Sequence, residues 1–282
     1  MENNVENAEI WFTELQKPGM KISCKVLQML HREQSPFQEI VFLDTVQFGR
    51  MLILDGAVQV TLMDEFVYHE MLAHVPLHAH PAPKDVLIIG GGDGGTAREV
   101  LRHENVESVT LVEIDRRVVE LSRRYLPELA CSYDNPKLQV YFEDGVEFVK
   151  KKKSSYDIVL VDSPDPIGQA ERLFGGEFFS SIFEALRPDG MFVVQTESPF
   201  VDKELVSRVY SDVSRLFPIA KVYIGVVPTY PAALWAFTVG SKKYDPEKLQ
   251  RKPVFEDVLR YYNAELHEAA FKLPNFVKRL LR

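Results

Sequence analysis

The feature that most constrains this chain is an apolar strand that breaks into a glycine-rich turn and continues at once as a helix pattern. Residues 86–100 read Val-Leu-Ile-Ile-Gly-Gly-Gly-Asp-Gly-Gly-Thr-Ala-Arg-Glu-Val. Gly90, Gly92 and Gly95 have the GxGxxG spacing, which lets a nucleotide-like ligand approach the backbone at the carboxyl end of a strand. The pattern predicts a doubly wound α/β fold, although many such folds carry something similar.

Asp93 lies inside this turn and narrows the choice of ligand. In a dinucleotide-binding enzyme the turn and the following helix N-terminus receive a pyrophosphate, which a carboxylate would repel. Asp93 therefore favours a ligand that presents a cation, and an NAD-dependent dehydrogenase fits poorly.

From residue 84 onward, strand and helix patterns alternate along the chain, which predicts a mostly parallel sheet covered on both faces. Expected strands lie at 86–89, 108–113, 138–142, 157–161 and 191–195, with helices at 96–103, 116–125, 146–152, 178–186 and 203–217. Two later runs, 220–227 and 234–240, would add antiparallel strands at the edge. An amphipathic helical tail is expected from about residue 254.

The N-terminal part has a different pattern. Short apolar or alternating runs between residues 10 and 61 are separated by glycine-containing turns, which predicts a small antiparallel β domain. A helix is expected over 64–74, and three prolines within 76–83 indicate a linker. We therefore expect an N-terminal β-strand domain over 1–62 and a Rossmann-like catalytic domain with C-terminal helices over 63–282.

Polar side chains follow every strand of the expected parallel sheet, at the edge where such folds bind ligands. These residues are Asp93, Glu113, Asp144, Asp162 with Asp165, and Gln195. An acid after a strand is often only a helix cap. Glu113 departs from that interpretation because an acid ending the second strand is the usual acceptor for ribose hydroxyls. Asp162 and Asp165 depart from it because they flank Pro164 in a rigid turn.

Carboxylates held close together repel each other, and a cationic ligand such as a diamine relieves that repulsion. An alkyl ammonium has a pKa of roughly 10, so only about one molecule in a thousand carries a given nitrogen as free amine at neutral pH. A carboxylate that accepts the proton would supply the missing step. The aromatic rings of Tyr68 and Tyr230 would attract the ammonium group and complete an amine-binding site. We expect Trp235 and Phe237 to be ordinary core residues.

Overall charge and termini exclude other classes. The net charge of −8 argues against nucleic acid as a partner. No apolar run reaches membrane-spanning length, and the acidic N-terminus does not resemble a signal peptide. Cys24 and Cys131 are far apart and indicate a reducing compartment. We expect a soluble, cytoplasmic protein.

Taken together, the motifs of this chain resemble those of the spermidine synthases, the polyamine aminopropyltransferase family. The resemblance extends along nearly the whole chain. The motifs that carry it are Trp11-Phe-Thr-Glu14, Phe37-Gln38-Glu39, Leu54-Asp-Gly56, Asp64-Glu-Phe-Val-Tyr68-His-Glu-Met71, the glycine turn, Val112-Glu113-Ile-Asp115, Asp144-Gly145, Asp162-Ser-Pro-Asp165-Pro166-Ile-Gly168, Gln195-Thr-Glu197, Pro228-Thr-Tyr-Pro231 and Ala269-Ala-Phe271-Lys-Leu-Pro274.

The resemblance implies an N-terminal β domain, a Rossmann-like methyltransferase-type domain, and a homodimer or homotetramer. It implies transfer of an aminopropyl group from decarboxylated S-adenosylmethionine to putrescine, giving spermidine and methylthioadenosine. Asp162 would be the base, assisted by Tyr68. Cofactor-binding residues would be Gln38, Gln59, Gly90, Gly92, Asp93, Glu113, Asp144 and Gly145. The diamine would meet Tyr68, His69, Asp93, Asp162, Asp165, Gln195 and Tyr230, and residues 162–174 would close over both substrates.

No metal or prosthetic group is expected, since a sulfonium leaves as a neutral thioether. His69, Glu70 and His74 form an HExxxH pattern, but its histidines are about 140° apart around a helix and do not share a ligand face. His78 and His80 are expected in the proline-rich linker.

Three alternatives stay open at this point. The acceptor could be cadaverine or agmatine, because Pro164, Gln169 and Ala232-Ala233 depart from the commonest family sequence. An S-adenosylmethionine-dependent methyltransferase would keep Glu113 and Asp144, but the carboxylate of its donor would oppose Asp93. A non-catalytic polyamine- or nucleoside-binding module would have no need of Asp162 and Asp165.

Overall fold

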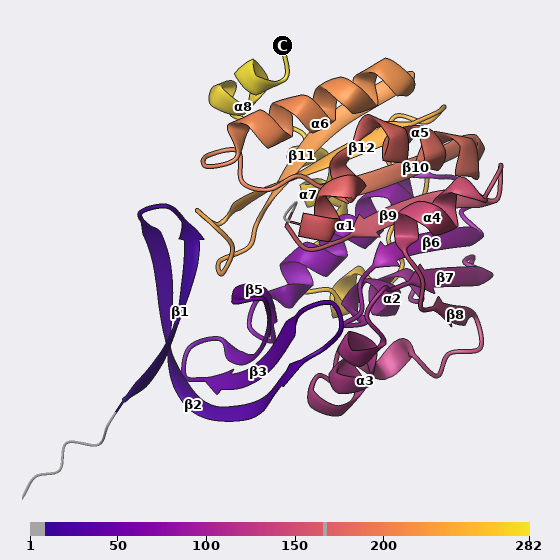
Figure 1. The fold of residues 1–282 in the computed structure, drawn as a ribbon. Helices are drawn as coiled ribbons and strands as arrows, with labels where there is room; N and C mark the ends of the chain where they lie inside the picture. Colours follow the sequence, from indigo (N-terminus) through magenta and orange to yellow (C-terminus); the bar gives the residue numbers. More distant parts are fainter. Residues whose placement is uncertain (1–8, 166–167) are drawn as a thin grey trace, which may run out of the picture. The chain divides into compact units, whose positions relative to one another are not determined.

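The computed structural model describes residues 9–165 and 168–282, and the chain divides into two compact units, Met1–Asp64 and Glu65–Arg282. The division falls just after the boundary expected from the sequence. Figure 1 shows the strands and helices of each unit.

The first unit is a five-stranded antiparallel sheet in the order β1-β2-β3-β4-β5. One face of this sheet packs buried Val41, Leu43, Met51 and Ile53 together, because alternate residues of each strand point to the same side. Its strands are β1 (Ile10–Lys17), β2 (Met20–Gln34), β3 (Glu39–Thr45), β4 (Gly49–Leu54) and β5 (Ala57–Thr61).

The second unit contains a seven-stranded sheet in the order β11-β12-β10-β9-β6-β7-β8. Strands β6 to β10 are mutually parallel, whereas β12 and β11 are antiparallel at one edge, as the sequence predicted. The strands are β6 (Asp85–Gly90), β7 (Ser108–Val112), β8 (Leu138–Tyr141), β9 (Tyr156–Asp162), β10 (Leu186–Gln195), β11 (Ile219–Val226) and β12 (Leu234–Ser241).

Helices cover both faces of this sheet (Figure 1). Alternate residues of β6 point to opposite sides: Ile88 packs with α1 and α2, while Leu87 and Ile89 pack with α4 and α5. The helices are α1 (Glu65–Ala79), α2 (Gly95–Val100), α3 (Arg116–Tyr125), α4 (Gly145–Lys150), α5 (Gly176–Ala185), α6 (Lys203–Leu216), α7 (Ala264–Ala269) and α8 (Asn275–Leu280), with short 3₁₀ turns η1 (Ala130–Ser132), η2 (Gly168–Phe174) and η3 (Glu256–Val258). This is a Rossmann-like architecture.

Two local expectations were wrong. The segment expected as a proline-rich linker is largely helical, because α1 continues through Pro76 to Ala79, so His78 lies on the helix. Burial of nearly every residue of α1 compensates for the hydrogen bond that a proline removes. The tail is not one amphipathic helix, since it contains η3, α7 and α8 with irregular chain between them.

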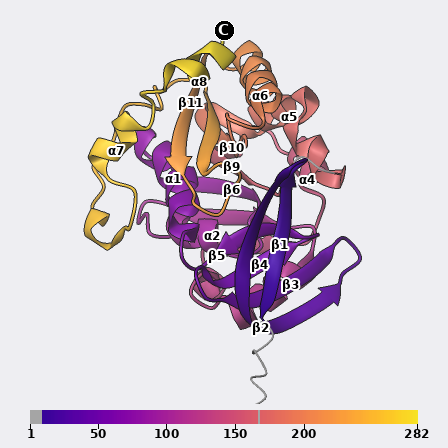
Figure 2. The same ribbon diagram turned by 90° about the vertical axis from the view of Figure 1, so that its left-hand side faces the viewer.

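The irregular chain between η3 and α7 lies beside α1 (Figure 2) and is bound to it by hydrogen bonds. The carboxylate of buried Glu70 accepts the backbone N–H groups of Arg260, Tyr261 and Tyr262 at 2.7–2.9 Å. A charged side chain thereby satisfies three backbone donors that no helix or strand would satisfy.

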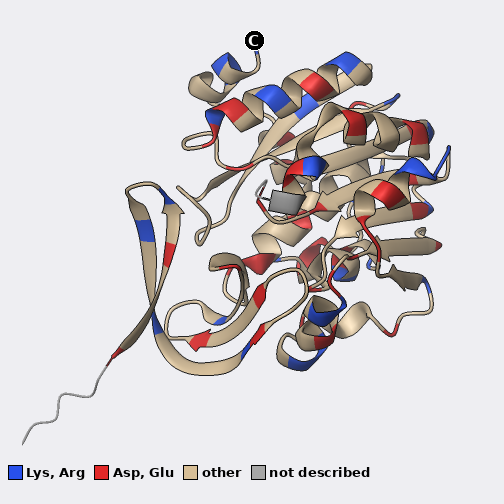
Figure 3. Cartoon of the chain, viewed as in Figure 1, with Lys and Arg blue, Asp and Glu red and all other residues tan. Residues whose placement is uncertain are grey.

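None of the helices within the described residues is long and apolar enough to cross a membrane. The outer helices carry charges of both signs; α6, for example, contains Lys203, Glu204, Arg208, Asp212 and Arg215 (Figure 3).

Candidate active site

The order of the sheet reverses between β6 and β9, and the candidate site lies at the carboxyl ends of these two strands. Gly90, the last residue of β6, pairs directly with Asp162, the last residue of β9. The backbone N–H of Gly91 also donates to the carbonyl of Asp162 at 2.8 Å. Ligands of open α/β sheets bind at such a reversal.

The glycines of the turn make room for side chains of the site. A Cβ on Gly91 would lie 2.8 Å from Oδ2 of Asp162, and one on Gly92 would lie 2.9 Å from Oε2 of Glu113. A Cβ on Gly95 would lie 2.2 Å from Cε1 of His69. The turn is therefore packed against two acids and a histidine.

Asp162 is buried and its carboxylate is held by two hydroxyl groups. Thr96 Oγ1 donates to Oδ2 at 2.6 Å, and Tyr68 also hydrogen-bonds to this side chain. Burial, followed by the charge of Asp93, raises the pKa of Asp162 to about 6, and the nearby His69 and the two hydroxyl groups oppose that rise. The acid that acts most strongly on Asp162 is thus Asp93, not its sequence neighbour Asp165.

Asp93 is held by His69 and by its own turn. Its Oδ1 accepts the N–H of Gly95 at 2.7 Å and lies 3.3 Å from Nε2 of His69. Burial works against ionisation of Asp93, but His69 outweighs it and lowers the pKa. The other ring nitrogen of His69, Nδ1, lies 2.7 Å from Oε2 of Glu65.

Glu113 follows β7 and is also buried. Its Oε1 accepts the backbone N–H of Asp115 at 2.9 Å. Burial raises its pKa to about 7. A buried acid with so few partners has spare acceptor capacity, which is what hydroxyl groups of a ligand require.

For Asp144 the structure supports the helix-cap interpretation as well. Oδ1 caps α4 by accepting the N–H of Val146 at 2.8 Å, and Oδ2 pairs with Arg172 at 2.8 Å. A Cβ on the next residue, Gly145, would lie 2.4 Å from Ile89, so this glycine is required for packing of α4 on β6.

The aromatic and amide candidates lie beside these acids. Tyr68 is buried and contacts the ring of Tyr230 edge to face, with centroids 5.8 Å apart. Gln195 ends β10, and its Nε2 lies 3.4 Å from the carbonyl of Ser163. Asp165 is half-buried after β9. Trp235 and Phe237 are buried core residues, as expected.

The remaining candidates lie in the first unit or in the segment that follows β9. Gln38 precedes β3 and Gln59 lies within β5, both in the first unit. Residues 166 and 167 of the expected closing segment 162–174 lie outside the described residues. The part from Gly168 to Phe174 forms η2.

Sequence reasoning missed four residues that support the site. Thr96 binds Asp162, Glu65 binds His69, and Arg98 binds Glu65 at 2.8 Å. Tyr133 donates its hydroxyl to the carbonyl of Gly92 at 2.9 Å. Only Thr96 had a sequence signal, because it follows the glycine turn directly.

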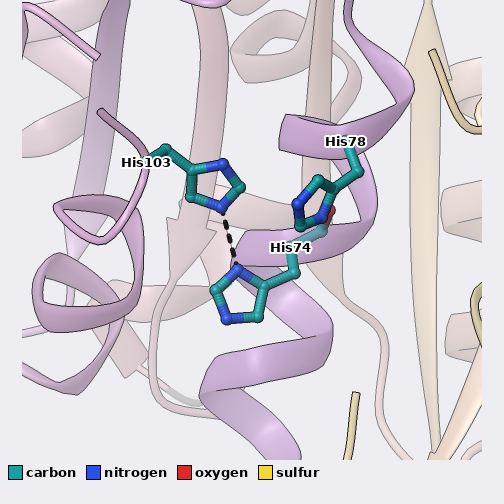
Figure 4. A group of neighbouring side chains, drawn as sticks. All are labelled: His74, His78 and His103. Carbon is teal, nitrogen blue, oxygen red and sulfur yellow. Dashed lines mark hydrogen bonds between the residues drawn. The ribbon is translucent and has the colours of Figure 1, made fainter. Parts of the chain in front are cut away.

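A second cluster of buried histidines, formed by His74, His78 and His103, lies between α1 and the segment after α2 (Figure 4). Nη2 of Arg251 can only donate, so Nδ1 of His103 accepts and its Nε2 carries the hydrogen that points to Nδ1 of His74, 2.9 Å away. Nε2 of His74 then donates to Glu99 at 3.1 Å. This chain of hydrogen bonds fixes one proton arrangement and gives the cluster a structural role.

His69 and His74 therefore face different partners, and they do not form one ligand set. His78, on the same helix, donates from Nδ1 to the carbonyl of His74 at 3.1 Å and stacks on Tyr262. Burial, reinforced by His74 and Arg251, lowers the pKa of His78 to about 2.

The fold and the group of acids at the switch point define a Rossmann-like transferase. The family model described as "Spermine/spermidine synthase domain" matches residues 65–252, and the one described as "Spermidine synthase tetramerisation domain" matches residues 10–61. The chain belongs to the spermine/spermidine synthase family and is a polyamine aminopropyltransferase.

Individual relatives agree with this assignment. The polyamine aminopropyltransferase of Desulforudis audaxviator is 52% identical, covering 95% of this chain and 98% of the relative. That of Moorella thermoacetica is 51% identical, covering 96% of each chain. A crystal structure of spermidine synthase in complex with the transition-state analogue AdoDATO matches with a TM-score of 0.92 and 42% identity, over 96% of this chain and 94% of that chain. Spermidine synthase from Thermotoga maritima gives 0.90 and 41% over the same shares.

Proposed function

We propose that this enzyme transfers the aminopropyl group of decarboxylated S-adenosylmethionine to putrescine, with Asp162 as the base. The observation that carries the proposal is the group formed by Asp93, Asp162 and Glu113 around a glycine turn, in which Asp162 and Glu113 are buried and Asp93 is partly buried. Such a group suits a ligand that combines an adenosyl sulfonium with ammonium groups. The AdoDATO complex of a similar spermidine synthase supports the same donor.

On the donor side, Asp93 would bind the aminopropyl ammonium and Glu113 the ribose hydroxyls. Gly90 and Gly92 would allow close approach of the nucleoside, and Asp144 with Gly145 would lie against the adenine. Gln38 and Gln59 are proposed to contribute from the first unit. Full S-adenosylmethionine carries a carboxylate that Asp93 would repel, so we expect the decarboxylated donor to bind far better.

On the acceptor side, Asp162 would take the proton of the attacking nitrogen. A carboxyl group with a pKa of about 6 is ionised at neutral pH, yet it is a stronger base than an ordinary aspartate. Tyr68 would orient Asp162 and the amine. His69, Asp165, Gln195 and Tyr230 would line the diamine channel.

The reaction would be a direct displacement. The nitrogen lone pair forms the new N–C bond while the C–S bond breaks, and sulfur keeps the electron pair as a neutral thioether. The leaving group needs no proton and no metal, so the protein's task is to align the nitrogen and remove its proton.

We further propose a homodimer or homotetramer built through the first unit. Its strands β1 and β2 expose Ile10, Trp11, Leu15, Leu27 and Met29. An exposed group of large apolar side chains is typical of a protein–protein interface. The matching family description names a tetramerisation domain. Size measured by light scattering, with Trp11→Ser as an interface variant, tests this assembly.

The test of the reaction is product analysis. The enzyme is incubated with decarboxylated or full S-adenosylmethionine and each of putrescine, cadaverine, agmatine and spermidine, and methylthioadenosine and the new amine are quantified. We expect spermidine from putrescine and the decarboxylated donor. Preference for another amine would correct the acceptor, and methyl transfer from the full donor would overturn the reaction.

Asp162→Asn tests the base. The variant should bind methylthioadenosine normally while turnover falls about 10²- to 10⁴-fold, the usual contribution of a general base. Near-normal turnover would show that another group accepts the proton.

A further inference from the structure

The ring of His69 lies between two carboxylates. Nδ1 is 2.7 Å from Oε2 of Glu65, and Nε2 is 3.3 Å from Oδ1 of Asp93. Ionised carboxylates only accept hydrogen bonds, and a neutral imidazole has only one N–H to donate. Both contacts are satisfied together only when both ring nitrogens carry hydrogen, so this geometry requires an imidazolium.

The surrounding charges agree with that requirement. Burial disfavours a charged ring, but Asp93 and Glu65 outweigh it and raise the pKa of His69 to about 10. Glu65 is itself shared with Arg98, whose Nη2 lies 2.8 Å from Oε2. His69 and Arg98 thus both pair with Glu65, and His69 also pairs with Asp93. Asp162 adds a further acid beside Asp93 and His69, and Arg98 is shared with Glu99.

A ligand ammonium that pairs with Asp93 would meet the imidazolium on the same carboxylate. Two cations in a buried site repel each other strongly. Loss of the Nε2 hydrogen removes the repulsion and turns Nε2 into an acceptor. The ammonium could then donate to both Asp93 and His69, while Nδ1 keeps its hydrogen bond to Glu65.

We propose that His69 releases its Nε2 proton when an ammonium group binds to Asp93, and that Glu65 is a positioning residue that keeps His69 charged in the empty site. The inference rests on the proposed function, in which Asp93 meets a cationic nitrogen. The N–H bond at Nε2 breaks, the electron pair stays on nitrogen and the proton passes to solvent. One positive charge leaves the pocket as another enters.

Other titratable groups face the same place and set the conditions for a test. Asp162 on β9 and Glu113 after β7 have pKa values raised to about 6 and about 7, chiefly by burial. The pKa values of Tyr68 on α1 and Tyr133 after η1 are raised well above their usual range by burial. At pH 8.5 the two acids are already ionised and the tyrosines are neutral, so His69 is the group of this set that can release a proton.

The experiment is titration calorimetry of the intact enzyme with decarboxylated S-adenosylmethionine at pH 8.5, in two buffers of different ionisation enthalpy. We expect nearly one proton released per ligand bound. Methylthioadenosine lacks the ammonium and should release none. Release of no proton by the wild-type enzyme on binding the decarboxylated donor would overturn the inference.

The ligand could also lose its own proton, and His69→Gln separates the two sources. Proton release should disappear in this variant; if it persists near one, the proton comes from the ligand and the inference is wrong. Histidine-selective NMR of the wild-type enzyme gives a readout without substitution, because the His69 ring should change from imidazolium to neutral when the donor binds.

Glu65→Gln tests the positioning residue. It should lower the pKa of His69 in the empty enzyme, so that proton release at pH 8.5 falls well below one. Glu70→Gln is the matched control, since Glu70 is buried on the same helix but binds the backbone of Arg260, Tyr261 and Tyr262. It should leave the proton count unchanged. If Glu65→Gln binds ligand with an unchanged proton count, its role is only structural.

Failure of this inference is distinguishable from failure of the proposed function. Normal binding and methylthioadenosine production without proton release would reject the His69 exchange alone. Absence of both binding and product would reject the proposed function.

Discussion

Thr96 donates its hydroxyl hydrogen to Oδ2 of Asp162 at 2.6 Å, joining the start of α2 to the end of β9. The bond stabilises the ionised carboxylate, and it opposes the effects of burial and of Asp93 on the pKa of Asp162. Thr96 does not itself accept a proton, but it helps to set the pH above which the proposed base, Asp162, is ionised.

Thr96→Val should shift the pH dependence of the reaction. Without the hydroxyl the pKa of Asp162 rises above about 6, so kcat/KM falls more at pH 6 than at pH 8.5. A hydrogen bond to a charged group contributes about 1.5–3 kcal/mol, which corresponds to a shift of the acid limb by about one pH unit or more. The measurement is kcat/KM from pH 5 to 9.

Thr238→Val is the control for that experiment, because Thr238 is a buried threonine of β12 whose hydroxyl group pairs with that of Thr196. Its acid limb should match that of the wild type. Equal shifts of the acid limb in the Thr96→Val and Thr238→Val enzymes would indicate a general loss of stability.

Gly95→Ala should disturb His69. The added Cβ would lie 2.2 Å from Cε1 of the ring, so either the ring or α2 must move. Overpacking of this kind costs about 1–3 kcal/mol of unfolding free energy, and displacement of His69 should raise the KM for the amine. Urea unfolding and amine saturation kinetics measure the two effects.

Gly176→Ala provides the contrast, because nothing lies within 4 Å of a Cβ at this position at the start of α5. It should keep or slightly raise the stability. A stable Gly95→Ala enzyme with an unchanged KM would contradict the close packing.

His78 should make the protein sensitive to mild acid. Its pKa is about 2 in the folded state, against about 6.5 when unfolded, so below pH 6.5 the unfolded chain binds a proton that the folded chain does not. Stability therefore falls as the pH falls from 6.5, by about 1.4 kcal/mol per pH unit from this residue alone.

His78→Phe tests that contribution, since phenylalanine can keep the stacking on Tyr262 without titrating. Between pH 6 and pH 5 the variant should lose about 1.4 kcal/mol less than the wild type in urea unfolding. An equal change of unfolding free energy with pH in the two proteins would refute the assignment of this pH dependence to His78.

Ala232 and Ala233 hold two consecutive left-handed conformations, with φ of 57° and 59°. This conformation costs a residue with a Cβ about 1–2 kcal/mol. Ala233→Gly should raise the unfolding free energy by about 0.5–1 kcal/mol after the greater chain entropy of glycine is included. The same change at Ala269, the exposed last residue of α7, should lower it by up to about 1 kcal/mol, the cost of glycine inside a helix. Calorimetric Tm values compare the two.

The sequence predicted the parts of this structure that follow from local pattern. Short apolar runs predicted β6 and β9, and the positions of Asp93, Glu113 and Asp162 after their strands brought them to one end of the sheet. Pro76 within α1 was misjudged because local propensity disfavours it, whereas burial of the whole helix decides the outcome.

The supporting residues could not be predicted because their roles depend on contacts between distant segments. Arg98 and Glu65 are 33 positions apart, and Thr96 and Asp162 are 66 positions apart. Nothing in the local pattern of either partner identifies the other. Likewise, the sequence indicated that Asp162 and Asp165 are held close together in one turn, but it gave no sign that Asp93 is the acid with the largest effect on the pKa of Asp162.

Asp162 confines Gly90 and Gly91, Glu113 confines Gly92, and His69 confines Gly95. A comparison based on the glycine spacing alone would group this chain with proteins that bind pyrophosphate at a similar turn. The two kinds of protein differ in the side chains that occupy the space where a Cβ of each glycine would lie. A descendant that exchanged those acids for neutral side chains could therefore keep every glycine and still change its chemistry.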